Sequence, residues 1–297
     1  MNAIAHAAVL DGVVKRFGAT IALDRVGLAI EPAKVTALLG PNGAGKTTAI
    51  SLWLGLAQPD AGRVELLGDV PRRLATRRRV GVMMQGATLP DTLRVRELLR
   101  LTASYYPQPR PLEELATLTG IGALLPRLYG KLSAGQQRRV QFALAICGNP
   151  ELLFLDEPTT GLDVEARQSL WSVVRSLVRD GCAVLLTTHY LEEAEALADR
   201  VAVLIRGRIA TAGTLDAIRS QCMRRRIRCV SVLSAEQIGR WPHVSEATRR
   251  DGRLQLVVDV AEPVVRRLLA EDAALSDLEV SAAGLAEAFV QITREAA

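Results

Sequence analysis

The spacing of apolar and polar positions predicts a sheet in which strands alternate with helices. Four short runs, at 35–39, 80–84, 152–155 and 183–187, are almost entirely apolar, which is typical of strands buried on both faces. Helical spacing follows each of these runs. Because parallel strands are joined by crossover helices, this pattern favours an α/β fold with a mostly parallel sheet that is covered on both faces.

Two regions depart from this plan. Residues 7–17 and 21–30 alternate between apolar and polar positions and end in turn residues, which predicts an antiparallel β subdomain at the start of the chain. From about Pro90 to Gly148 the spacing is helical. We therefore expect an inserted helical subdomain over about 88–148.

The character of the chain changes again after Gly213. Residues 201–205 and 208–211 predict a hairpin that closes the first domain. The elements expected beyond it are short strands at 226–233, 254–260 and 278–282 and helices near 262–271 and 284–294. The sequence therefore predicts a large α/β domain over 1–213 and a small C-terminal α+β domain over 214–297.

Composition and charge exclude several classes of protein. Of the 297 residues, 49% are hydrophobic and 23% are charged, which is ordinary for a globular chain and argues against disorder. The net charge of +5 is well short of that of a dedicated nucleic-acid binder, so we expect no nucleic acid as a partner.

No run of residues approaches the roughly 18–20 apolar positions that a membrane-spanning helix needs. The first residues, MNAIAHAAVLDG, lack the basic start of a signal peptide, so we expect a soluble chain in the cytosol. Cys147, Cys182, Cys222 and Cys229 form no CxxC pattern and are expected to be reduced thiols.

The segment GPNGAGKTT at 40–48 fits the phosphate-binding pattern GxxxxGK[ST] between a predicted strand and a predicted helix. Its glycines let backbone N–H groups converge on phosphates, and the helix that follows directs the positive end of its dipole at the same place. Lys46 supplies a charge for the β- and γ-phosphates, and Thr47 supplies a hydroxyl for Mg²⁺. The residues predicted to bind the nucleotide here are Gly40, Pro41, Asn42, Gly43, Ala44, Gly45, Lys46, Thr47 and Thr48.

A pair of carboxylates follows another buried strand, in LLFLDEPTTGLD at 152–163. In a doubly wound sheet the carboxyl ends of the strands face the nucleotide. Asp156 is then suited to hold Mg²⁺, and Glu157 is suited to accept a proton from an attacking water. A strand-end pair of this kind also occurs as a helix cap, but the phosphate loop upstream favours the catalytic interpretation.

Two further polar residues end buried strands. His189 closes AVLLTTH at the edge where the phosphate loop also leaves the sheet, so we expect it to contact the γ-phosphate, although a single histidine is more often structural. Gln85 ends the strand at 80–84 and is expected to reach Mg²⁺ or water.

The segment LSAGQQRRV at 132–140 is not required by phosphate binding alone. Ser133 is suited to cap a helix that runs to about Cys147, and the N-terminus of that helix is a second anion site. Together with the phosphate loop and the strand-end carboxylates, this segment resembles the ATP-binding subunit of ABC transporters, whose signature motif is usually LSGGQ. The resemblance covers 7–213, with Ala134 where the usual motif has glycine.

The resemblance implies a P-loop NTPase fold of the ABC ATPase type that hydrolyses ATP with Mg²⁺. It also implies a head-to-tail dimer, either a homodimer or an ABC heterodimer, with ATP at the interface. In that arrangement Ser133, Gly135 and Gln136 of one subunit contact the ATP held by the other.

Three further residues match motifs of the family. Phe17 in KRFGATIAL matches the aromatic residue that stacks on adenine, and a core phenylalanine is the alternative. Asp163 matches the loop that touches the phosphate loop of the partner subunit. Gln85 matches the loop that senses Mg²⁺ and couples to the membrane subunit, and His189 matches the switch histidine.

Two segments narrow the resemblance. MMQGATLPDTLRVRELL at 83–99 and GLAEAFVQITRE at 284–295 look like ATPases of ABC-2 type drug and antibiotic exporters. This subfamily implies a separate transmembrane permease, a peripheral position on the cytoplasmic face of the membrane, and export of a drug-like, antibiotic or lipid substrate. The alternatives are an importer ATPase, a soluble ABC ATPase that acts on nucleic acid or the ribosome, and a regulator that binds ATP without hydrolysis.

Overall fold

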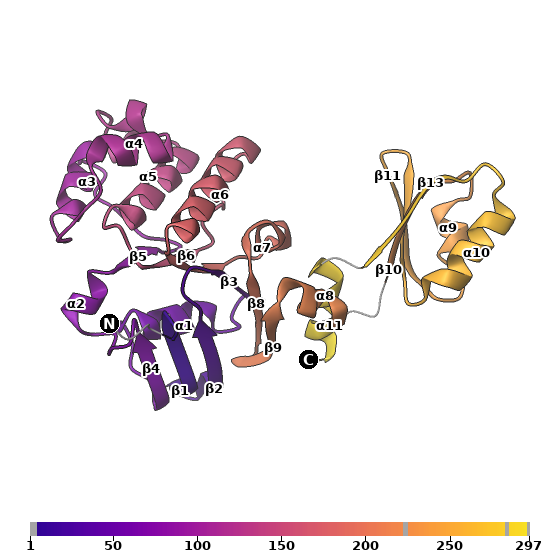
Figure 1. The fold of residues 1–297 in the computed structure, drawn as a ribbon, viewed down its shortest axis with the longest axis horizontal. Coiled ribbons are helices and arrows are strands. Elements are labelled where there is room, and N and C mark those ends of the chain that lie inside the picture. Colours follow the sequence, from indigo (N-terminus) through magenta and orange to yellow (C-terminus); the bar gives the residue numbers. More distant parts are fainter. Residues whose placement is uncertain (1–4, 222–224, 283–284, 296–297) are drawn as a thin grey trace. The chain divides into compact units, whose positions relative to one another are not determined.

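The computed structural model describes residues 5–221, 225–282 and 285–295, and Figure 1 shows their fold. The chain divides into two compact units, Met1–Ala212 and Gly213–Ala297. Within the described residues, no helix is both long enough and apolar enough to cross a membrane.

The centre of the first unit is a six-stranded sheet in the order β5-β6-β7-β3-β8-β9. Its strands are β3 (Val35–Leu39), β5 (Val80–Met83), β6 (Leu152–Asp156), β7 (Ala183–Thr187), β8 (Arg200–Ile205) and β9 (Arg208–Thr214). The first five strands in this order pair in parallel. Every residue of β3, β6 and β7 is buried, which confirms the interpretation of their almost entirely apolar runs.

The two faces of this sheet belong to different hydrophobic cores. Leu153 and Leu155 of β6 join the core formed with the helical subdomain, whereas Leu152 and Phe154 join the core on the opposite face. This division follows from the period of two along a strand. The helices of this unit are α1 (Lys46–Trp53), α2 (Leu74–Arg77), α3 (Val95–Ala103), α4 (Leu112–Thr119), α5 (Ala134–Ile146), α6 (Val164–Arg179) and α7 (Leu191–Leu197), with single 3₁₀ turns at Gly122–Leu124 and Tyr129–Lys131.

The second face of the sheet is covered by α1 and a small antiparallel sheet. That sheet has the order β2-β1-β4, with β1 (Ala8–Phe17), β2 (Thr20–Ile30) and β4 (Ala61–Leu66). The predicted β1–β2 pair is confirmed. The third strand, β4, was not predicted, because its residues AGRVEL are mostly exposed or half-buried and carry little apolar alternation.

The second unit contains a four-stranded antiparallel sheet in the order β11-β12-β10-β13. Its elements are α8 (Leu215–Gln221), β10 (Arg225–Val230), α9 (Ala235–Ile238), β11 (Val244–Arg250), β12 (Arg253–Val258), α10 (Ala261–Glu271), β13 (Ser276–Ala282) and α11 (Leu285–Glu295). The run from β10 to β13 has the β-α-β-β-α-β order of ferredoxin-like folds. Strand β11 was not predicted, because its residues VSEATRR are largely polar and form an edge strand.

The cysteines of the described residues agree with the expectation of free thiols. Cys147, Cys182 and Cys229 are free and buried. Cys222 lies outside the described residues. Burial raises the pKa of the Cys147 thiol to about 11 and that of Cys182 to about 12.

Candidate functional site

The glycines of the phosphate loop are required by backbone geometry. Gly43 and Gly45 have φ of 79° and 109°, which L side chains rarely adopt. A Cβ atom on Gly45 would lie 2.5 Å from the carbonyl oxygen of Ala22. A Cβ atom on Gly40 would lie 2.3 Å from the carbonyl oxygen of Leu204. The loop therefore packs against the main chain of β2 and β8, and positions 40 and 45 have no room for a side chain.

Lys46 is the first residue of α1 and is only 8% exposed. Its Nζ donates hydrogen bonds to the carbonyl oxygens of Gly40 at 2.7 Å and Pro41 at 3.1 Å. Burial lowers the pKa of Lys46, and the negative charges of Glu157 and Asp156 oppose that shift. The ammonium group is thus held inside the loop at the start of the helix.

A cavity of about 380 Å³ opens beside the phosphate loop. The predicted residues that line it are Asn42, Gly43, Gly45, Lys46, Thr47, Thr48, Gln85, Asp156 and Glu157. The structure thus brings the phosphate loop together with the residues that end β5 and β6. The cavity is also lined by Thr20, Ile21 and Ala22, which were not predicted as site residues. In the sequence, these three residues are marked only by their position after the turn at 18–19, which follows Phe17.

Asp156 and Glu157 are both buried at the carboxyl end of β6. The Thr187 hydroxyl on β7 donates a hydrogen bond to Oδ1 of Asp156, and the backbone N–H of Glu157 donates to the carbonyl oxygen of Thr187 at 3.0 Å. Glu157 has φ of 50°, a left-handed conformation that is uncommon for a residue with a side chain. The end of β7 thus orients both carboxylate residues.

The Glu157 carboxylate is the point where three loops converge. Gln85 Nε2 donates to Oε2 of Glu157 at 3.2 Å, and the Thr160 hydroxyl lies 3.4 Å from the same oxygen. His189 Nδ1 lies 3.1 Å from Oε1, and the histidine side chain is 46% exposed. The ring of His189 also packs against that of Tyr190, with centroids 4.0 Å apart and the planes tilted by 38°. Predicted residues that are far apart in the chain therefore meet around one carboxylate.

The segment LSAGQQRRV at 132–140, called the signature segment below, contains the start of α5. Ser133 is the N-cap, its hydroxyl accepts from the Gln136 N–H at 3.3 Å, and the Gln136 side chain accepts in return from the Ser133 N–H at 3.1 Å. A Cβ atom on Gly135 would lie 3.4 Å from the carbonyl oxygen of Gly161. The signature segment therefore lies next to the loop before α6 in the same chain, and it does not line the phosphate-loop cavity.

The remaining predicted residues do not line the phosphate-loop cavity. Asp163 caps α6, because its Oδ1 accepts from the Ala166 N–H at 2.8 Å. Phe17 is 57% exposed, so the alternative that it belongs to the core is wrong. Ala44 is buried in the loop, and Gly40 and Pro41 contribute their carbonyl oxygens to Lys46. Arg138, which donates hydrogen bonds to the backbone carbonyl oxygens of Asp156 and Glu157, was also not predicted as a site residue.

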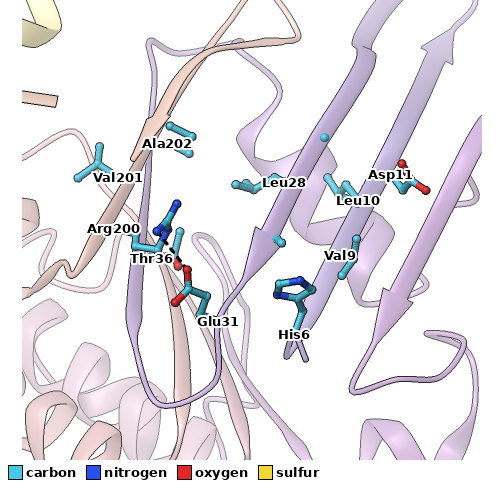
Figure 2. A pocket seen from close by; sticks show the side chains of 13 residues that line it. His6, Val9, Leu10, Asp11, Leu28, Glu31, Thr36, Arg200, Val201 and Ala202 are labelled. Carbon is cyan, nitrogen blue, oxygen red and sulfur yellow. Dashed lines mark ion pairs between the residues drawn. The ribbon is translucent and has the colours of Figure 1, made fainter. Parts of the chain in front are cut away.

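A second cavity, of about 400 Å³, shares no residue with the first. Figure 2 shows it between the starts of β1 and β8, with the side chains of His6, Glu31, Thr36 and Arg200 gathered at one end. Arg200 Nη1 pairs with Glu31 Oε1 at 3.1 Å. None of the predicted site residues lines this cavity, so it is separate from the candidate site.

Comparisons with known proteins agree with this geometry. Residues 23–160 match the ABC transporter family. The chain is 42% identical over 243 residues to the daunorubicin resistance ATP-binding protein DrrA3 of Streptomyces coeruleorubidus. This alignment covers 78% of this chain and 76% of that protein. It is 43% identical over 206 residues to the Nod factor export ATP-binding protein I of Burkholderia thailandensis, covering 66% and 67%.

Solved structures give the same result. The structure of an ATP-binding subunit of an ABC transporter matches with a TM-score of 0.69 and 29% identity, over 72% of this chain and 92% of that one. A dimeric bacterial ABC transporter cassette has the same fold, with a TM-score of 0.64 and 24% identity over 70% and 98%. The phosphate loop, the signature segment and the similarity to these relatives show the same family. The chain belongs to the family of ATP-binding subunits of ABC transporters.

Proposed function

We propose that this subunit hydrolyses ATP to ADP and phosphate and thereby powers export of a drug-like, antibiotic or lipid substrate through a separate membrane permease. The observation that carries the hydrolysis is the Glu157 carboxylate, which lines the phosphate-loop cavity between Gln85 and His189. The names of the relatives, which concern daunorubicin resistance and Nod factor export, support the direction of transport and the class of substrate.

Glu157 is the proposed general base. Its carboxylate lies at the cavity, where it accepts a proton from the water that attacks the γ-phosphate. Lys46 and the backbone N–H groups at the start of α1 stabilise the negative charge on the phosphates. His189, which lies against Glu157, assists in stabilising the transferred phosphoryl group.

The residues around the cavity fit Mg²⁺. Thr47, Gln85 and Asp156 line it together and offer hydroxyl, amide and carboxylate oxygens, which are the ligands that this hard cation prefers. When bound, Mg²⁺ neutralises charge on the β- and γ-phosphates. The hydrogen bond from Thr187 to Oδ1 of Asp156 orients the carboxylate for this role.

The proposed working form is a dimer, either of two copies or with a related ABC subunit. Ser133 and Ala134 are exposed at the start of α5, so the signature segment is accessible to a partner subunit. In the dimer Ser133, Gly135 and Gln136 contact the ATP of the partner, and the Asp163 loop contacts the partner's phosphate loop. The Gln85 region transmits closure of the dimer to the permease at the cytoplasmic face of the membrane.

Replacement of Glu157 by Gln tests the catalytic part of this proposal. The variant keeps the size of the side chain and loses the base, so binding of a fluorescent ATP analogue should be unchanged and phosphate release should nearly cease. Glu113→Gln, on the exposed surface of α4, is the matched control and should retain full activity. Normal ATPase activity in Glu157→Gln would refute the assignment.

Affinity capture from the native organism tests the transport part. The tagged chain should co-purify with a membrane protein of about six spanning helices encoded beside it. Co-purification with RNA or DNA in place of a membrane protein would favour the soluble nucleic-acid ATPase and contradict the proposal.

A further inference from the structure

Arg138 lies on α5, five residues after the helix cap Ser133, and is only 9% exposed. Its guanidinium group donates to main-chain carbonyl oxygens and to one side chain. The acceptors are Met84 O at 3.4 Å, Asp156 O at 2.9 Å, Pro158 O at 3.3 Å, Glu157 O, and Gln141 Oε1 at 3.0 Å. A single side chain therefore binds four carbonyl oxygens from two separate loops.

These two loops carry the groups that meet at the candidate site. Met84 directly precedes Gln85, and the other three carbonyls belong to the segment that contains Glu157. The hydrogen bond of 3.2 Å from Gln85 Nε2 to Glu157 Oε2 joins the same two loops on their cavity side. By binding the main chain of both loops, Arg138 holds them at the spacing that the hydrogen bond between Gln85 and Glu157 requires.

The backbone at Glu157 needs such support. Its φ of 50° is a conformation that persists only where the surrounding structure holds it. Arg138 binds the carbonyl oxygens of Asp156 and Glu157, which lie on either side of the Glu157 Cα atom. Burial lowers the pKa of Arg138, and the charges of Asp156 and Glu157 oppose this shift, so the carboxylates compensate the buried cation.

We propose that Arg138 is a positioning residue that couples the signature segment to the Glu157 carboxylate of the same chain. The 13 residues of α5 form a continuous helix, so contacts made at Ser133 are transmitted along a rigid element to Arg138. Through Arg138 they reach the main chain on both sides of Glu157 and the residue before Gln85. This inference rests on the proposed hydrolysis of ATP.

The test compares Arg138→Lys and Arg138→Met with a surface control, Arg179→Met on α6, in the purified full-length protein. Lysine keeps the charge, but a single ammonium group cannot bridge the Met84 carbonyl and the 156–158 carbonyls together. We expect kcat to fall about 10- to 100-fold in both Arg138 variants, because small displacements of a catalytic group have effects of this size. The KM for ATP and the binding of an ATP analogue should change less than about twofold, while the control retains its kcat.

A double-mutant cycle with Gln85→Ala separates positioning from general stability. If Arg138 acts through the Gln85–Glu157 arrangement, Arg138→Lys combined with Gln85→Ala should lower kcat by less than the product of the two single effects. Unaltered kcat in Arg138→Lys, or equal losses of ATP binding and kcat, would overturn the inference. Fully multiplicative effects would also overturn it. If Glu157→Gln abolishes turnover while both Arg138 variants are normal, only the role of Arg138 fails and the proposed function stands.

Discussion

Alanine substitutions at Gly43 and Gly45 should differ in their effect on stability, although both glycines lie in one loop with positive φ. At Gly43, a Cβ atom would meet no heavy atom within 4 Å. At Gly45, it would lie 2.5 Å from the Ala22 carbonyl oxygen and 2.8 Å from Leu23 Cδ2. Gly43→Ala therefore adds only conformational strain, whereas Gly45→Ala adds both strain and steric overlap.

The magnitudes follow from these two contributions. A left-handed conformation costs an L residue about 1–2 kcal/mol, which applies to both variants. Overpacking a rigid site costs about 1–3 kcal/mol more, which applies to Gly45→Ala alone because one of the atoms it meets is backbone. We therefore expect the free energy of unfolding to fall by about 1–2 kcal/mol in Gly43→Ala and by about 2–5 kcal/mol in Gly45→Ala.

Urea unfolding without nucleotide, followed by tryptophan fluorescence, measures this difference. Trp53 and Trp171 lie in the first unit and report on its core, whereas Trp241 belongs to the second. The extra loss in Gly45→Ala should also lower Tm by about 2–4 °C per kcal/mol relative to Gly43→Ala. Equal stability of the two variants would refute the argument that close packing against β2 selects glycine at position 45.

Two further predictions concern buried ionisable groups. Glu193 is fully buried on α7, and burial raises the pKa of its carboxyl group above the value of about 4.3 in the unfolded chain. The protonated carboxyl group therefore contributes fully to the free energy of unfolding below about pH 4.3, and this contribution is lost as pH rises through the folded-state pKa. Glu193→Gln, which is neutral at every pH, should reduce this decline in urea unfolding measured across pH, and an unchanged pH dependence would contradict the assignment. Burial raises the pKa of the Cys182 thiol to about 12, and the thiolate is the form that reacts with iodoacetamide. Iodoacetamide at pH 8 should therefore modify Cys182 only after unfolding, which mass spectrometry of the peptides can check. Labelling of the folded protein at the rate of the unfolded protein would show that the thiol is accessible.

The elements that the sequence predicted are those whose burial leaves a distinct pattern. Residues of β3, β6 and β7 are buried on both faces, so each appears as an almost entirely apolar run that ends at a site residue or within two residues of one. Strands β4 and β11 left no such pattern, because they are partly exposed and carry several charged residues. Their positions are set by pairing with β1 and β12, which the local sequence does not encode.

The same distinction applies within the site. Lys46, Asp156 and Glu157 were predicted because their motifs are local in sequence. Arg138 was not, because four of its five acceptors are backbone carbonyls 18–54 residues away, and any residue type offers a carbonyl oxygen. The sequence around Arg138 indicated only the helix that carries it.

The order of strands explains why Glu157 is the point of convergence. Gln85, Glu157 and His189 follow β5, β6 and β7, which are consecutive neighbours in the sheet. The residue after the middle strand is therefore flanked on both sides, as the contacts of 3.2 Å and 3.1 Å show. The phosphate loop follows β3, which lies beyond β7 although it comes first in the chain. With strands about 4.8 Å apart, the ends of β6 and β3 are separated by about 10 Å, so the Lys46 loop and the Glu157 carboxylate line one cavity from either side of the end of β7.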